Sequence, residues 1–208
     1  MNAKQHFDKN IERVKHLGFI YTTVNDTTTS AVDLSGILRA QYVMLVSALD
    51  YYLHELIRSF MIEIYKGNKS STKGFKKFIF SIDQDVLLKK GIINPQNEEW
   101  LNFQILYKNG FKSFQHSSKI VEAFELITDL KSEDLWKNIS NGMGQLFCEN
   151  DIITKLNLII ERRNQIAHEA DIEPTFNTLR SIYKTDVEDS INFIETFVTS
   201  IDNFTQSL

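Results

Sequence analysis

The stretch ERRNQIAHEAD, residues 161–171, places two arginines, an asparagine and a histidine close together. A helix is predicted over residues 151–169, and its apolar stripe is formed by Ile152, Ile153, Leu156, Ile159, Ile160, Ile166 and Ala167. Arg163 falls in the middle of this stripe, where a guanidinium requires an anionic partner because an unpaired charge is strongly unfavourable there. Arginine is a forked donor to phosphate, and histidine exchanges protons near neutral pH. The stretch therefore suggests a cleft that handles phosphate groups.

A flank of the same predicted helix carries a polar stripe formed by Asn157, Glu161, Asn164 and His168. Asn164 and His168 are four residues apart, so their side chains are neighbours on the helix surface. Two interpretations stay open. In the structural one, Arg163 pairs internally, for example with Asp50, and His168 is an ordinary histidine favoured by the dipole at the helix end. In the catalytic one, the arginine binds phosphate and the histidine transfers a proton.

Asp50 lies on a second predicted helix, which begins near Asp33 or Ser35 and runs to about Tyr65. This helix is apolar on most sides through its middle, as expected of a helix surrounded by others. Asp50 and His54 are one turn apart and can meet on one face. The simpler interpretation of His54 is a core histidine.

The remaining elements predict an all-α chain, because prolines are few and alternating strand patterns are scarce. A first helix is expected over residues 3–17, with Gly18 as its stop, followed by a loop over 22–30. Shorter helices are expected after Pro95 and near residues 117–127. The last two long helices are expected to begin at Asn150 or Asp151 and at a capping box of Thr185 and Glu188.

Residues 66–119 form a lysine-rich insertion within what we predict to be a single domain over residues 1–208. They hold ten lysines and four acidic residues, a local charge of +6 in a chain whose formal charge is -4. Such a patch could attract a phosphate backbone through Lys69, Lys73, Lys76 and Lys77, although lysines also simply solvate exposed loops.

Composition excludes several classes of protein. The formal charge of -4 and pI near 5.8 argue against coating of nucleic acid by bulk electrostatics, so any nucleic-acid contact must be local. The single cysteine, Cys148, excludes an intrachain disulfide and is expected to be a small core residue. No Cys/His cluster has zinc-ligand spacing, and neither metal nor cofactor is predicted. The apolar run at 42–49 is shorter than the roughly 20 residues of a membrane span, and no secretory signal is evident, so a soluble cytoplasmic protein is expected.

RRNQIAHEAD at 162–171, together with RAQYVMLVSALDYYLHEL at 39–56, resembles the HEPN superfamily and, more narrowly, its RiboL-PSP branch. The resemblance implies an all-α helical bundle with a long central helix, and a metal-independent endoribonuclease that acts as a homodimer. Carried over residue by residue, it implies that Arg163, Asn164 and His168 are the motif residues. Arg162 is a possible substitute for Arg163. Asp50 matches an acidic position of the branch and, like Glu161, receives a supporting role.

The implied reaction is attack of the RNA 2′-hydroxyl on its own phosphate, which gives 2′,3′-cyclic phosphate and 5′-hydroxyl ends. Arg163 and His168 point about 140° apart around one helix, so two copies about a twofold axis would form the cleft more readily than one. A neutralising antitoxin or a defence partner would fit such a nuclease. Ala170, however, stands where nucleotidyltransferase-paired HEPN proteins carry a modified tyrosine. The alternative is a non-catalytic HEPN module that binds RNA, a nucleotide or a partner protein, with the lysine-rich insertion as its main contact.

Overall fold

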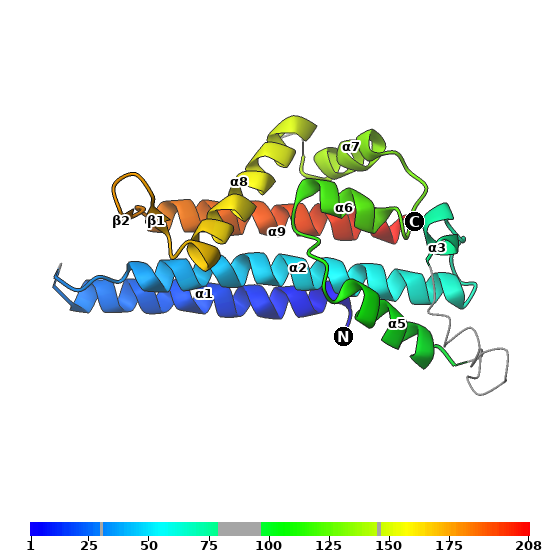
Figure 1. Cartoon of the computed structure of the whole chain (residues 1–208), viewed down its shortest axis with the longest axis horizontal. Coiled ribbons are helices and arrows are strands. Elements are labelled where there is room, and N and C mark those ends of the chain that lie inside the picture. The colour runs from blue at the N-terminus through cyan, green and yellow to red at the C-terminus, as the bar shows by residue number, and fades with distance from the viewer. Residues whose placement is uncertain (30, 79–96, 145–146) are drawn as a thin grey trace. The chain divides into compact units, whose positions relative to one another are not determined.

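The computed structural model describes residues 1–29, 31–78, 97–144 and 147–208. Helices form nearly all of its regular structure, together with one small antiparallel hairpin (Figure 1). The all-α prediction is confirmed. By internal contacts the chain divides into unit 1, residues 1–52 and 136–207, and unit 2, residues 53–135 with Leu208. The central helix α2 (Ser35–Tyr65) is continuous, and its two parts belong to different units. That residues 1–208 form a single domain stays a prediction.

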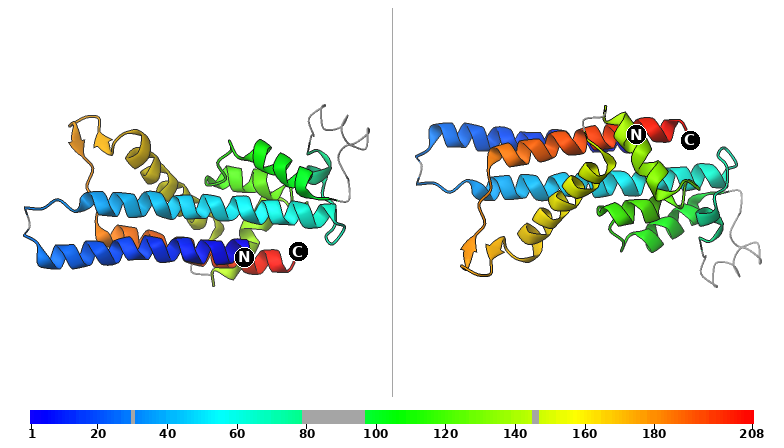
Figure 2. Two further views of the ribbon diagram at one scale, coloured as in Figure 1. Left: turned by 90° about the horizontal axis from the view of Figure 1, so that it is seen from below. Right: turned by 90° about the horizontal axis from the view of Figure 1, so that it is seen from above.

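Three long helices run side by side in unit 1: α1 (Ala3–Thr27), the first part of α2, and α9 (Lys184–Gln206) (Figures 1 and 2). α1 runs antiparallel to the other two. Each of them contributes an apolar face to a common core, and the most buried side chains include Phe7, Val14, Leu45, Leu49, Ile194, Phe197 and Ile201. Burial of such faces, rather than helix propensity, supplies most of the stability of helices in proteins.

α1 is longer than predicted, because Gly18 does not end it and residues 22–27 are helical. A Cβ atom at Gly18 would lie 2.7 Å from Nε2 of the buried Gln41 on α2, so the glycine allows a close approach between the two helices. The hydroxyls of Thr22 and Thr27 donate to the carbonyl oxygens four residues earlier, at 3.0 and 2.9 Å. Threonines that satisfy themselves on the helix backbone in this way are compatible with helix, although they resemble a loop in sequence.

Helix α7 (Ser132–Gly142) enters unit 1 at Trp136 and packs on α9 there. The Trp136 ring stacks on Phe197 with centroids 6.3 Å apart, and the Ser200 hydroxyl donates to the Ile139 carbonyl at 2.6 Å. Gly142 sits directly against Ser200, since a Cβ atom there would overlap with the Ser200 hydroxyl oxygen. This contact leaves no room for a side chain at position 142.

Helix α8 (Glu149–His168) follows, and Figure 1 shows it crossing the bundle obliquely. Its cap is Cys148 rather than Asn150 or Asp151, and the Asp151 carboxylate accepts from the Cys148 backbone N–H at 3.2 Å. Cys148 is exposed, so the expectation of a core cysteine was wrong. The α9 cap is likewise Tyr183 rather than Thr185. Sequence patterns placed both helices correctly and erred only at their first residues, where helix boundaries are hardest to assign.

A hairpin that the sequence analysis did not predict joins α8 to α9. It consists of β1 (Ile172–Glu173) and β2 (Thr178–Leu179), paired antiparallel. Pro174 lies between the strands, where a proline removes no hydrogen bond from the pairing. The hairpin follows the motif stretch directly and therefore sets the path of the chain beyond His168.

Unit 2 contains the last turns of α2 with α3 (Lys73–Lys76), α5 (Glu99–Asn109) and α6 (Ser117–Phe124). Arg58 on α2 bonds to Glu55 and to Asn102 on α5, and the Thr72 hydroxyl donates to the Leu126 carbonyl at 2.9 Å. The two helices predicted after Pro95 and near residue 117 correspond to α5 and α6. Part of the predicted insertion, residues 79–96, lies outside the described residues.

Among the helices that the structure describes, none combines the length and apolarity needed to cross a membrane.

Candidate functional site

The buried stripe of α8 leads to the motif residues. Ile152, Leu156, Ile159 and Ile160 are buried, as predicted. Burial fades toward the end of the helix, where Ile166 is half-buried and Ala167 is exposed, so the apolar face ends earlier than expected. Arg163 is half-buried, and its Nε atom is inaccessible to solvent. Arg163 therefore lies at the point along α8 where the fully buried stripe gives way to half-buried residues.

The other motif residues lie on the last turns of α8. Asn164 is half-buried, Glu161 is exposed, and His168 is the exposed last residue of the helix. Asp50, the proposed supporting acid, is half-buried on the part of α2 that belongs to unit 1. The motif stretch thus reaches solvent at the C-terminal end of α8.

Arg162, the alternative motif arginine, is engaged by a carboxylate. Its Nη1 and Nη2 atoms donate to the two carboxylate oxygens of Asp171, the second at 3.0 Å, and Nη2 also donates to the Ser181 carbonyl at 3.1 Å. The Asp171 side chain is only 1% exposed. This is the bidentate geometry that the guanidinium fork favours.

Arg39 on α2 reaches the same carboxylate from the other side. Its Nε donates to Asp171 Oδ2 at 2.6 Å, and its Nη2 donates to the Arg180 carbonyl at 2.7 Å. The Arg39 and Arg162 side chains are 13% and 19% exposed. We refer to Asp171, Arg39 and Arg162 together as the Asp171 clamp, and it joins α8, α2 and the segment that follows α8.

The backbone at Asp171 takes part as well. Ala170 and Asp171 both adopt left-handed conformations, with φ of 52° and 58°, which reverse the chain just beyond the helix. The Asp171 N–H donates to the Gln165 carbonyl at 2.9 Å, and the Asp171 carbonyl accepts from Arg180 N–H at 2.8 Å. The reversal returns the carboxylate to Arg162 on the preceding turns of α8.

Charges of both signs surround the clamp. Arg180 pairs with Glu169 at 3.1 Å, and the pKa of Glu173 is lowered by a hydrogen bond from the Phe176 N–H and, to a smaller extent, by the positive charge of Arg180. Near them, burial raises the pKa of the Tyr42 phenol, although a hydrogen bond with Ser190 and the positive charge of Arg162 oppose this rise.

The lysines proposed for RNA contact lie in unit 2. Lys73, Lys76 and Lys77 are exposed on α3 and the residue after it, whereas the Lys69 ammonium sits 4.5 Å from the centre of the Phe60 ring. Lys69 is thus engaged in a cation–π contact. Within the described ranges, no group of three or more His, Cys, Asp or Glu side chains is arranged to hold a metal ion.

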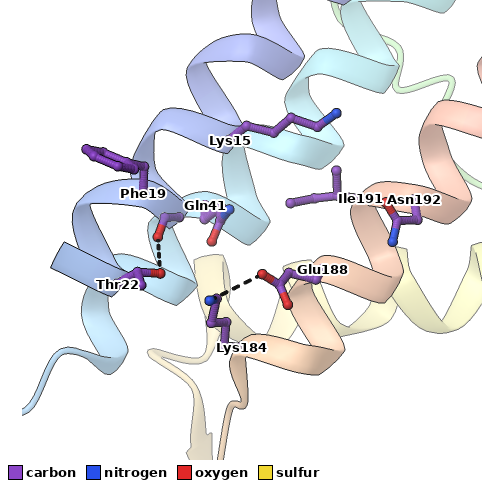
Figure 3. A pocket seen from close by; sticks show the side chains of 9 residues that line it. Lys15, Phe19, Thr22, Gln41, Lys184, Glu188, Ile191 and Asn192 are labelled. Atoms are coloured by element: carbon purple, nitrogen blue, oxygen red, sulfur yellow. Dashed lines mark hydrogen bonds and ion pairs between the residues drawn. The ribbon is translucent and has the colours of Figure 1, made fainter. Parts of the chain in front are cut away.

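A groove of about 410 Å³ lies between α1, α2 and α9 (Figure 3). Its lining includes Lys15, Phe19, Gln41, Lys184 and Glu188, and none of the motif residues. The charged side chains at its edges pair with neighbouring residues: Lys15 with Glu195 at 2.7 Å, and Lys184 with Glu188 at 3.5 Å. We assign this groove no role.

Sequence reasoning gave no role to three residues of this region: Arg39, Asp171 and Arg180. Arg39 and Asp171 stand at the edges of the two motif stretches, which was the only available signal. Their convergence depends on the chain reversal at Ala170, where no glycine marks the left-handed turn.

A family model supplies the identity of the chain. The model of the RiboL-PSP-HEPN family matches residues 8–207, which include α8 with its motif, α2 and the Asp171 clamp. No curated protein and no solved structure matches the chain. Because the match spans almost the entire sequence, the protein belongs to the RiboL-PSP-HEPN family.

Proposed function

We propose that this protein is a metal-independent endoribonuclease of the defence, stress or toxin–antitoxin kind, with Arg163, Asn164 and His168 as its site. Membership in the HEPN superfamily indicates a nuclease or RNA-related function. The observation that carries the finer proposal is the different placement of the two adjacent arginines. Arg162 is bound by Asp171, and Arg163, Asn164 and His168 share the last turns of α8, where the buried stripe gives way to an exposed helix end.

The proposed reaction needs only groups that the chain and the RNA supply. The imidazole of one His168 takes the proton of a 2′-hydroxyl, whose oxygen then attacks the adjacent phosphorus. The bond from phosphorus to the 5′ oxygen breaks, and a protonated imidazole gives that oxygen its proton. Arg163 stabilises the negative charge that grows on the phosphate oxygens, and Asn164 helps to hold the phosphate. The products are a 2′,3′-cyclic phosphate and a 5′-hydroxyl end.

A homodimer is part of the proposal for a geometric reason. Arg163 and His168 point about 140° apart around α8, so one copy does not readily aim both side chains at one phosphate. Two copies related by a twofold axis would bring two α8 ends together, and each cleft could then combine an arginine and a histidine from different chains.

Cleavage assays on purified protein test the mechanism. Structured RNA is incubated in excess EDTA with the wild type, Arg163→Ala and His168→Ala, and with Arg13→Ala and His16→Ala as matched exposed controls on α1. We expect the wild type and both controls to cut, and His168→Ala to lose about 10²–10⁴-fold in rate, as for removal of a general acid–base group. RNA with a 2′-deoxy nucleotide at the cut should resist. Loss of wild-type cutting in EDTA, or equal cutting by all variants, would refute the mechanism.

Mixing subunits tests the composite cleft. Arg163→Ala and His168→Ala are combined and allowed to exchange. If the cleft takes its arginine and histidine from different chains, mixed dimers regain part of the activity that each pure variant lacks. If activity does not return although native mass spectrometry shows that mixed dimers form, the shared cleft is wrong.

A non-catalytic RNA-binding module is the second candidate, and α5 favours it. Phe103, Tyr107 and Phe111 are 62%, 63% and 91% exposed, and consecutive rings lie 6.4 Å apart. Exposed aromatic rings are a common platform for stacking unpaired bases. In this case RNA binding should weaken more in Tyr107→Ala, or in a variant with Lys73→Glu, Lys76→Glu and Lys77→Glu, than in His168→Ala. Controls with arginine in place of the three lysines should bind RNA normally. The opposite ranking would count against the module.

A further inference from the structure

We infer that Asp171 is a positioning residue, which acts through Arg39 and Arg162 to fix the end of α8 and thereby aim Arg163 and His168. This inference rests on the proposed function and adds to it residues outside the motif. Three separate parts of unit 1 meet at this one carboxylate: α2, α8 and the chain that leads into the hairpin.

Every polar group of Asp171 has a partner within the protein. The carboxylate accepts from Arg39 and from both terminal nitrogens of Arg162, the backbone N–H donates to Gln165, and the carbonyl accepts from Arg180. With a side chain 1% exposed, Asp171 has no surface left for substrate. Its effect on RNA must therefore pass through the residues that it holds.

The clamp lies at the place where a helix is least constrained. The last turn of a helix lacks partners for its carbonyl groups and frays easily. His168 is the final residue of α8, and two left-handed residues without glycine's freedom begin two positions later. Such conformations persist only where surrounding interactions impose them. The Asp171 hydrogen bonds are the interactions that do so here.

The position of the clamp next to Arg163 explains why the clamp would affect the rate of the chemical step. Arg162 precedes Arg163 directly, and Arg39 ties it through Asp171 to the helix that carries Asp50. The rotation of α8 about its axis is thus set against α2, and that rotation decides where Arg163 points. A displacement of about 1 Å between reacting groups can lower a rate by about 10²-fold.

The test compares Asp171→Asn with Glu173→Gln, an acid-to-amide change two residues away that leaves the clamp intact. Single-turnover cleavage gives the chemical rate, and binding of an RNA with a 2′-deoxy nucleotide at the cut gives Kd. Circular dichroism checks that each variant is folded. We expect Asp171→Asn to lose about 10²-fold in chemical rate, with Kd within about threefold of wild type and Glu173→Gln unchanged. A folded Asp171→Asn with wild-type rate would overturn the inference, as would an equal loss in Kd.

Two further measurements keep the test decisive. If Asp171→Asn does not fold, Arg39→Lys replaces it, because lysine keeps the charge but cannot reach both Asp171 and the Arg180 carbonyl. A smaller fall in rate at constant Kd is then expected, and an unchanged rate overturns the inference. If the wild type cuts no RNA, the proposed function fails by itself. The positioning role is then tested by NMR of the His168 imidazole. If Asp171 positions the end of α8, the imidazole signals shift or broaden in Asp171→Asn and stay unchanged in Glu173→Gln.

Discussion

Replacing Asp171 by asparagine should destabilise unit 1 strongly, by more than an ordinary surface ion pair contributes. The change removes one negative charge and leaves the guanidinium groups of Arg39 and Arg162 facing each other across a neutral amide. Asparagine has nearly the same shape as aspartate and tolerates the left-handed conformation observed at this position. The variant therefore isolates the loss of charge from a change in backbone strain.

The exposed fractions of the three clamp side chains determine how large a loss of unfolding free energy we expect. Breaking a buried ion pair by removing one partner costs about 3–5 kcal/mol, because a charge stays behind without compensation. Asp171 is 1% exposed, but Arg39 and Arg162 retain 13% and 19%, so water can partly solvate them. We therefore expect Asp171→Asn to lower the free energy of unfolding by about 3 kcal/mol, the lower end of this range. Asp171→Ala should lose about 1 kcal/mol more, since alanine tolerates the left-handed region less well.

The two tryptophans make a selective assay possible. Trp136 is in unit 1 and stacks on Phe197, whereas Trp100 is in unit 2. In a Trp100→Phe background, fluorescence therefore follows the unfolding of unit 1 by urea. The control is Glu195→Gln on α9, which loses a solvent-exposed pair with Lys15 and should change stability by less than about 1 kcal/mol.

A value for Asp171→Asn within about 0.5 kcal/mol of the background, the usual range of neutral surface substitutions, would refute the reasoning. The clamp would then contribute little to stability, and its hydrogen bonds would be replaceable by water. A double-mutant cycle of Arg39→Leu with Asp171→Asn separates this case from a uniformly weakened fold, because partners in one network show coupling and unrelated residues do not.

Three other outcomes follow from the structure. Gly142→Ala should lower the stability of unit 1 by about 1–3 kcal/mol in urea unfolding, because its Cβ meets Ser200, whereas Gly36→Ala, with open space around it, should be neutral or stabilising. Burial and nearby carboxylates raise the pKa of Tyr52 well above its ordinary value. The folded state therefore keeps the phenol proton to a higher pH than the unfolded state does, and stability should fall as pH rises above about 10. Thermal melts taken across alkaline pH should show a smaller fall for Tyr52→Phe. Cys148 should react with a maleimide in the native protein nearly as fast as in urea, and strong protection would contradict its exposed position.

The periodic spacing of apolar residues predicted the long helices and the faces that they bury. The stripe of α8 and the apolar middle of α2 are visible as regular spacing, and the structure buries both, except that burial on α8 ends before Ile166. Gly18 misled the prediction, because a glycine that ends a helix and one that admits a neighbouring side chain look alike in sequence. Only the contact with Gln41 on another helix separates the two cases.

The candidate site was predictable only in part, for a related reason. The resemblance to the HEPN motif selected Arg163, Asn164 and His168, and it left Arg162, which is one residue farther from His168, as a possible substitute. In the structure Arg162 is bound by Asp171, which lies nine residues beyond it in sequence. Two left-handed residues that no glycine announces bring this acid back to the helix.

The neighbouring arginines illustrate how one short motif can serve two purposes. Consecutive residues on a helix point about 100° apart, so Arg162 and Arg163 leave the helix in different directions. Arg162 is part of the Asp171 clamp, and its position restrains the backbone that Arg163 shares. A catalytic arginine at the end of a helix needs a fixed backbone, because a long side chain on a fraying turn would lose its aim. If the proposed function is correct, the first arginine therefore contributes to catalysis through the fold, and the second through contact with RNA.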